Sequence, residues 1–165
     1  MPTSSRESVK TRKIICASVS IAIVVGIMLL LFVFSGQDAA ESSALSGRVT
    51  ALIIKVFRLD KTGLPLERAE HYVRKLAHFT IYSVLGVGLC GIAQCFLERM
   101  RFFAASLAGI LIAALDEFHQ LFVPGRSGLF TDVLIDSSGA LAGAIFVFII
   151  YSVYEKSRKK KCGTE

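Results

Sequence analysis

The sequence lacks the features of disulfide-rich, zinc-binding and soluble proteins. Its cysteines, Cys16, Cys90, Cys95 and Cys162, are too scattered for a disulfide framework, and no closely spaced Cys/His group accompanies them. The chain of 165 residues is 53% hydrophobic, which is more apolar residue than a soluble domain of this size can bury. The apolar residues are also gathered into blocks of about 20, the length that spans a hydrocarbon core of ~30 Å. The sequence therefore predicts an integral membrane protein.

Two processing signals are absent as well. No clear A-x-A cleavage site follows the first apolar block, residues 14–34, and this block is too long for the apolar part of a signal peptide. The last residues do not form a prenylation box. We therefore interpret residues 14–34 as a membrane span, whose role is anchoring and packing because it carries no charge.

The apolar blocks predict an all-α membrane protein with four transmembrane helices. The expected spans are residues 14–34, 73–97, 102–123 and 132–154, which together form one membrane domain over residues 14–154. Residues 1–13 and 155–165 are expected to be basic tails. Close helix packing should use small residues, and these are Gly86, Gly88 and Gly91 in the second span and the GxxxG pair Gly139 and Gly143 in the fourth.

A further amphipathic helix is expected in the loop after the first span. Apolar residues recur there at helical spacing, namely Leu45, Val49, Leu52, Ile53, Val56 and Phe57. Such a helix would lie on the outer membrane surface or cap the bundle. Residues 60–63 predict a turn, and Pro65 suits the first turn of a helix that runs into the second span.

Positive charge gives the expected orientation. Basic residues are densest in the two tails: Arg6, Lys10, Arg12, Lys13, Lys156, Arg158, Lys159, Lys160 and Lys161. Beside membrane spans, such clusters indicate the cytoplasmic side and contacts with anionic lipid, rather than binding of nucleic acid. Both termini are therefore predicted to be cytoplasmic, and the loops after the first and third spans are predicted to be outside.

Polar residues interrupt three of the four spans near this outer end. They are Arg74, Lys75 and His78 in the second span, Asp116, Glu117, His119 and Gln120 in the third, Arg126 in the following loop, and Asp132 and Asp136 in the fourth. Helical rise places Asp116 about 10 Å from the outer end of its span, and His78 and Asp136 about 6–8 Å from theirs. Carboxylates facing lipid are costly, so these side chains should face one another or a wet cavity.

Three interpretations of this polar cluster remain open from the residues. The first is a structural ion-pair network. The second is a pocket in which Arg74, Lys75 and Arg126 bind a phosphate or carboxylate, and the third is a hydrolase or transferase site. The third would use His119 or His78 as base, or a metal held by Asp116, His119 and a fourth-span aspartate. No serine or cysteine nucleophile beside a base stands out, so the sequence assigns no catalytic residue, no metal and no cofactor.

The chain resembles the VanZ-like membrane proteins, a family named for a teicoplanin-resistance protein of Gram-positive bacteria. The resemblance covers roughly residues 14–154 and is carried by Phe34-Ser35-Gly36-Gln37, Glu41-Ser42-Ser43-Ala44-Leu45-Ser46, Arg74-Lys75-Leu76-Ala77-His78-Phe79 with Tyr82 and Leu85-Gly86, Asp116-Glu117-Phe118-His119-Gln120-Leu121-Phe122-Val123-Pro124-Gly125-Arg126-Ser127, and Thr131-Asp132-Val133-Leu134-Ile135-Asp136. The third-span motif with its Pro-Gly-Arg turn is very specific. Gly36 departs slightly, since the family often has a second serine there.

The resemblance implies a four-helix protein of the bacterial plasma membrane. For the founding member it implies lowered susceptibility to lipoglycopeptides, and it implies no settled biochemical activity. All ten polar cluster residues match family-motif positions, without any chemistry being assigned to them by that match. We therefore expect a protein that binds or modifies a cell-envelope component at the outer face, with a membrane lipid, envelope precursor or lipoglycopeptide as partner. A membrane-embedded hydrolase and a structural partner protein are the alternatives.

Overall fold

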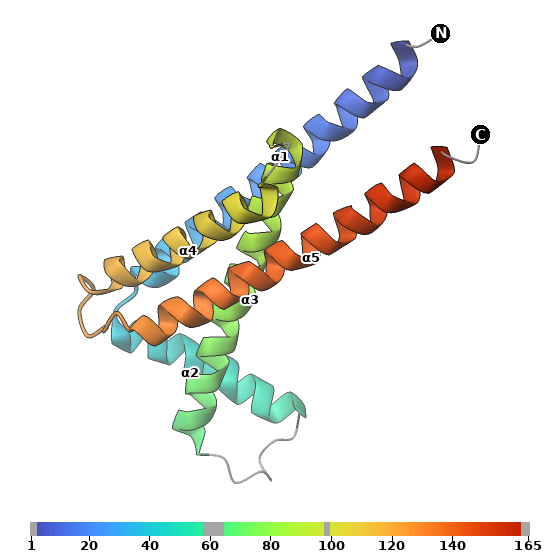
Figure 1. Ribbon diagram of the computed structural model, residues 1–165. Helices are drawn as coiled ribbons and strands as arrows, with labels where there is room; N and C mark the ends of the chain where they lie inside the picture. The colour runs from blue at the N-terminus through green and yellow to red at the C-terminus, as the bar shows by residue number, and fades with distance from the viewer. Residues whose placement is uncertain (1–2, 58–64, 98–99, 163–165) are drawn as a thin grey trace.

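The protein is a bundle of long helices. The computed structural model describes residues 3–57, 65–97 and 100–162, and every element within these ranges is an α-helix. The helices, seen in Figure 1, are α1 (Thr3–Ser35), α2 (Ala39–Phe57), α3 (Leu66–Phe96), α4 (Arg101–Gln120) and α5 (Phe130–Cys162). Four of them, α1, α3, α4 and α5, are long and apolar enough to cross a membrane. The prediction of an all-α fold with four spans is confirmed.

The helices extend beyond most of the apolar blocks but stop early in one place. Helix α3 begins directly after Pro65 and continues through the second span without a break. Helix α4 ends at Gln120, three residues before the expected end at Val123. The amides of residues 121–123 bond to carbonyls three residues back, and Pro124 has no amide with which to continue the helix. Asp116 therefore lies about 6 Å, rather than 10 Å, from the end of its helix.

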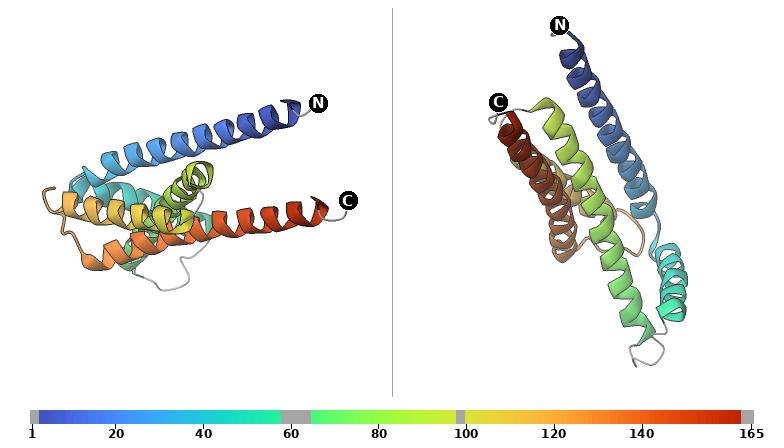
Figure 2. Two further views of the ribbon diagram at one scale, coloured as in Figure 1. Left: turned by 45° about the horizontal axis from the view of Figure 1, so that its top comes forward. Right: turned by 90° about the vertical axis from the view of Figure 1, so that its right-hand side faces the viewer.

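Helix α3 is the centre of the bundle. It contacts α1, α2, α4 and α5, and it runs obliquely across the other three spans (Figures 1 and 2). The α3–α5 crossing is close because glycines face backbone on the partner helix. A methyl group on Gly86 would collide with the Ala140 carbonyl, and one on Gly143 would collide with the Ser83 carbonyl. The prediction of close helix packing through small residues is confirmed at this crossing.

Two further glycines of α3 face α1. A methyl group on Gly88 would collide with the Val24 side chain, and one on Gly91 would collide with the Ser20 hydroxyl. Around these contacts the buried apolar side chains form one core near the loops, which includes Leu31, Tyr82 and Leu85, and a second core nearer the termini. The remaining apolar side chains of the spans face outward, as lipid-facing helices require.

Helix α2 covers the N-terminal part of α3. The Asp38 carboxylate accepts a hydrogen bond from the Glu41 amide at 2.8 Å and so caps the N-terminus of α2. Thr50 is fully buried, whereas Leu52 and Val56 of the expected apolar stripe are exposed. Contact of this stripe with a membrane surface remains a prediction. The Phe57 side chain and the expected turn at residues 60–63 lie outside the described residues.

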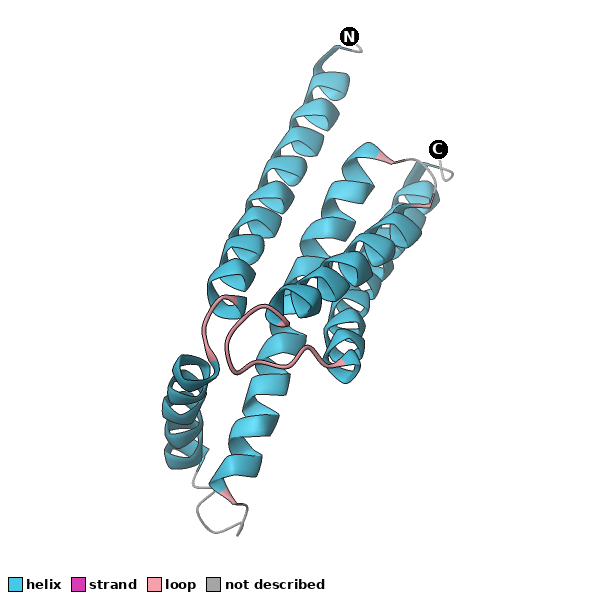
Figure 3. Cartoon of the chain, turned by 90° about the vertical axis from the view of Figure 1, so that its left-hand side faces the viewer, coloured by secondary structure: helices cyan, strands magenta, loops and turns pink. Residues whose placement is uncertain are grey.

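Both ends of the chain lie at the same end of the bundle. Figure 1 shows the N- and C-terminal helical ends together, and the α1–α2 and α4–α5 connections lie at the opposite end, beside α2. Figure 3 shows these two loops close together, near the middle of α3. This placement gathers the polar residues of four helices into one region.

Candidate functional site

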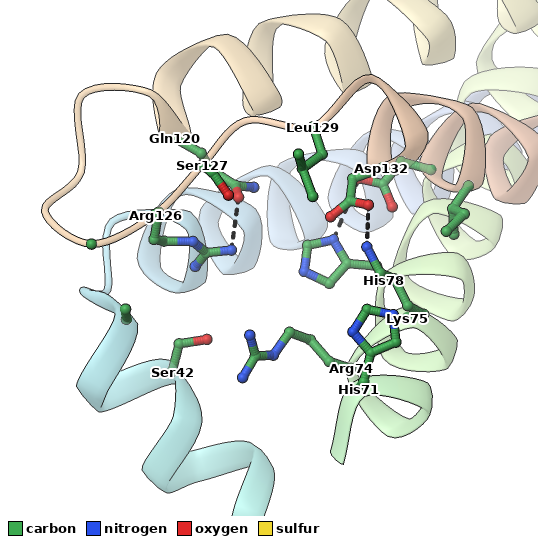
Figure 4. Close-up of a pocket in the computed structure, with 14 residues that line it drawn as sticks. Ser42, His71, Arg74, Lys75, His78, Gln120, Arg126, Ser127, Leu129 and Asp132 are labelled. Carbon is green, nitrogen blue, oxygen red and sulfur yellow. Dashed lines mark hydrogen bonds and ion pairs between the residues drawn. The ribbon is translucent and has the colours of Figure 1, made fainter. Parts of the chain in front are cut away.

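The polar cluster surrounds a cavity at the loop end of the bundle. The cavity has a volume of about 170 Å³. It is lined by Ala39, Ser42, His71, Arg74, Lys75, His78, Gln120, Gly125, Arg126, Ser127, Leu129, Asp132, Ile135 and Asp136. Helices α2, α3, α4 and α5 and the loop after α4 therefore all contribute side chains (Figure 4).

Two cross-helix contacts connect α3 to α5 along one wall. The Lys75 ammonium forms an ion pair with the Asp132 carboxylate, and His78 Nδ1 lies 3.3 Å from Asp136 Oδ2. In Figure 4 both contacts appear as dashed lines that join facing helices. Lys75 and His78 lie three residues apart on α3, and Asp132 and Asp136 lie four apart on α5, so each pair lies along one helix face.

Arg126 holds the loop after α4 against α1. Its Nη1 donates to the Phe34 carbonyl at 3.1 Å, and its Nη2 donates to Gln120 Oε1 at 2.8 Å. Gly125 precedes it with φ of 73°, a conformation that glycine adopts without strain. Both acceptors of Arg126 are neutral, so its positive charge is left without an acidic partner among the described residues.

Arg74 connects α3 to α2 in a similar way. Its Nη2 donates to the hydroxyls of Ser43 and Ser46 at 3.3 and 3.1 Å. Its Nε is buried and has no hydrogen-bond acceptor in the described part of the chain. Within those residues Arg74 also forms no ion pair, so a second uncompensated guanidinium lies at the cavity (Figure 4).

The first span contributes to the site, contrary to its expected role in anchoring and packing alone. The Ser35 hydroxyl, in the last turn of α1, donates to Asp116 Oδ1 at 2.5 Å. Gln120 Nε2 donates to Asp116 Oδ2 at 3.2 Å and to Ser35 Oγ at 3.4 Å. Sequence reasoning missed Ser35 because it has no charge, although the quoted motif after the first span contains it.

Glu117 is the second carboxylate of α4 and lies on its buried side. Its Oε2 accepts a hydrogen bond from the Leu129 amide at 3.0 Å, which connects α4 to the start of α5. Gly128 packs so closely that a methyl group there would lie 2.5 Å from the Glu117 carbonyl oxygen. Glu117 therefore contacts the loop after α4 through both its side chain and its backbone carbonyl.

Three predicted cluster residues, Asp116, Glu117 and His119, do not line the cavity, and His119 is the one that also faces away from the others. Its side chain is exposed, and its ring stacks on Phe32 of α1 with centroids 6.1 Å apart. It does not line the cavity, and the metal-ligand arrangement of Asp116, His119 and a fourth-span aspartate is not formed. Three helical positions after Asp116, His119 lies on the lipid side of α4, whereas Gln120 lies on the buried side. Other residues that the sequence did not single out include His71, Ser42, Ser43 and Ser46, and of these only the serines had a signal, in the quoted motif.

The sequence profile of the VanZ/LLP1 family matches residues 20–151. The chain belongs to the VanZ/LLP1 family. The match begins within α1 and ends within α5, so it includes every residue that lines the cavity. A search of curated proteins found no match, and a search of solved structures found none. As a VanZ/LLP1 protein with four candidate spans, the chain is an integral membrane protein.

Proposed function

We propose that the cavity binds the anionic group of a cell-envelope component at the outer face of the membrane. The observation that carries this proposal is the pair of guanidinium groups, Arg74 and Arg126, whose acceptors in the described residues are neutral. They reach the cavity from different elements, one from a span and one from a loop. Guanidinium groups with spare N–H donors are the usual partners of phosphate and carboxylate.

The size and position of the cavity favour a small charged group on a larger lipidic molecule. Its 170 Å³ is far more than the ~10–15 Å³ that one water requires by the same measure, yet too small for a whole glycopeptide. The cavity lies where α4 ends and α5 begins, and we place this region at the depth of the lipid headgroups. A phospholipid or a lipid-linked envelope precursor fits this arrangement, and its chains would remain in the bilayer.

Family membership supports a cellular consequence. Occupation or sequestration of an envelope component at this site would lower susceptibility to glycopeptide antibiotics of the teicoplanin type. The protein would act from the plasma membrane with both termini in the cytoplasm, so that the cavity opens outward. The basic C-terminal segment, which includes Lys156, supports this orientation.

A charge-matched pair of variants tests the binding. Arg74→Gln removes one guanidinium from the cavity, and Arg48→Gln removes one from the exposed surface of α2. Loss of a charge-assisted hydrogen bond costs about 1.5–3 kcal/mol, so Arg74→Gln should weaken binding of phosphatidylglycerol by about 10- to 150-fold. Arg48→Gln should leave the affinity unchanged.

The measurement uses the purified full chain in nanodiscs of phosphatidylcholine, titrated with phosphatidylglycerol, a polyprenyl phosphate and teicoplanin. The same variants, expressed in a susceptible Gram-positive host, are scored for teicoplanin susceptibility. Equal affinity of wild type and Arg74→Gln for every anionic ligand would refute the proposal. Retention of any resistance phenotype by Arg74→Gln would separate that phenotype from the cavity.

A further inference from the structure

Three carboxylates from two helices meet beneath the cavity. Asp116 and Glu117 belong to α4 and Asp136 belongs to α5, and one carboxylate oxygen from each lies within 4.8 Å of the others. Glu117 is 3% exposed and Asp136 is 0% exposed. All three lie within membrane-spanning helices.

The described residues offer these carboxylates little positive charge. Asp116 accepts hydrogen bonds from the neutral side chains of Ser35 and Gln120, and Glu117 accepts one from a backbone amide. His78 is the only basic side chain in contact, and it contacts Asp136. The Lys75 ammonium is engaged by Asp132 instead. The group therefore has more negative charge than its contacts offset. Carboxylates at membrane depth require a positive partner or a wet environment.

Unpartnered oxygen atoms point to a missing partner at the same place. Asp136 Oδ1 and Glu117 Oε1 are buried and have no hydrogen-bond partner among the described residues. Buried carboxylate oxygens without a partner are costly unless something positive binds them.

We propose that Asp116, Glu117 and Asp136 bind one divalent cation of the oxygen-preferring class, such as Ca²⁺, Mg²⁺ or Mn²⁺. Carboxylate oxygens are the ligands that these ions prefer, and Ca²⁺–oxygen distances of about 2.3–2.6 Å allow ligand oxygens up to ~5 Å apart across the ion. The observed spread of the three oxygens fits this limit. Asp136 also lines the cavity, which gives an ion and its waters a route to the site.

His78 acts as a positioning residue for this site. Its Nδ1 contacts Asp136 Oδ2, which leaves Oδ1 for the ion. Ligand carboxylates are commonly held in this way by a second hydrogen-bonding group. A bound cation would also offset the negative charge below the cavity, so that the positive charges of Arg74 and Arg126 determine the electrostatic potential at its rim. The cation site nevertheless does not depend on anion binding, and Arg74→Gln should retain it.

The test measures metal on the full chain. Purified protein in detergent is washed with a chelator and dialysed against Ca²⁺, Mg²⁺ or Mn²⁺. Bound metal is counted by mass spectrometry and its affinity is measured by calorimetry. Thermal unfolding is followed with and without metal. We expect one ion per chain and a higher Tm with metal. Asp116→Asn and Asp136→Asn should each weaken binding at least tenfold and remove the Tm shift. Glu67→Gln, at an exposed carboxylate in the first turn of α3 that lies outside the group and the cavity, is the matched control and should retain both.

Two results would overturn the proposal. Wild-type protein that binds none of the three ions at millimolar concentration, and whose Tm does not respond to them, would show that the carboxylates share protons instead. Binding that survives both asparagine variants would place the ion elsewhere. If either variant fails to fold, Glu117→Gln provides a third removal of a ligand, and the wild-type stoichiometry alone still decides whether an ion is bound.

Discussion

The closest helix contact gives the sharpest prediction about stability. Gly143 of α5 packs on the backbone of α3, and a methyl group there would lie 2.8 Å from the Ser83 carbonyl carbon and 2.9 Å from the Val87 amide nitrogen. Ordinary contacts of this kind are about 3.5–4.0 Å, and the Ser83 carbonyl oxygen lies closer still, so Gly143→Ala requires the two helices to separate by at least ~1 Å. Backbone atoms cannot rotate away as a flexible side chain can.

The expected cost combines overpacking with loss of neighbouring contacts. Overpacking in a well-packed core costs about 1–3 kcal/mol. Separation of α3 from α5 would also weaken the contact of Gly86 with Ala140, which lies on the same crossing. We therefore expect Gly143→Ala to lower the free energy of unfolding by about 2–3 kcal/mol.

Gly26→Ala is the matched control for this change. A methyl group on Gly26, in the middle of α1, would meet no atom within 4 Å. The same substitution in an open helical position favours the helix by about 0.5–1 kcal/mol. Unfolding in mixed micelles, followed by circular dichroism, compares the two variants with wild type. Equal stability of Gly143→Ala and Gly26→Ala would refute the close α3–α5 contact.

The remaining predictions concern the site. Ser127→Cys, in a background without native cysteines, should react with a membrane-impermeant maleimide added outside the cell; reaction only after permeabilisation would reverse the orientation. Ser35→Ala removes a hydrogen-bond donor from Asp116 and should lower the free energy of unfolding in micelles by about 0.5–2 kcal/mol. Ser138→Ala, on the exposed side of α5, is the control and should change the free energy of unfolding by less than ~0.5 kcal/mol. His119→Ala should leave lipid and metal affinity within twofold of wild type, and a larger loss would show that this exposed ring takes part in the site.

The architecture was predictable from the sequence because lipid constrains it strongly. Backbone groups within hydrocarbon must bond internally, so long apolar blocks form helices. The glycine contacts followed for a similar reason, since close packing between lipid-facing helices needs small side chains. Boundaries were less predictable: the block around Val123 is apolar, yet Pro124 and the bonds before it end α4 at Gln120.

The site was predictable in outline and less so in detail. Charged residues within spans revealed Arg74, Asp116 and Asp136, because ionisable side chains at membrane depth are rare. Helical spacing alone did not separate His119 from Gln120, which are adjacent in sequence and lie on different sides of α4. Neutral partners such as Ser35 give no charge signal. The convergence of Asp116, Glu117 and Asp136 depends on how α4 and α5 pack, which spacing within one helix does not reveal.

The central claim is that Arg74 and Arg126 form a binding site for an anionic group. The most direct measurement is native mass spectrometry of the full chain released from nanodiscs that contain equal amounts of phosphatidylglycerol and phosphatidylcholine. The account predicts that wild type and Arg48→Gln retain one phosphatidylglycerol, and that Arg74→Gln loses it. Retention of both lipids without preference by wild type, or unchanged retention of phosphatidylglycerol by Arg74→Gln, would contradict the account.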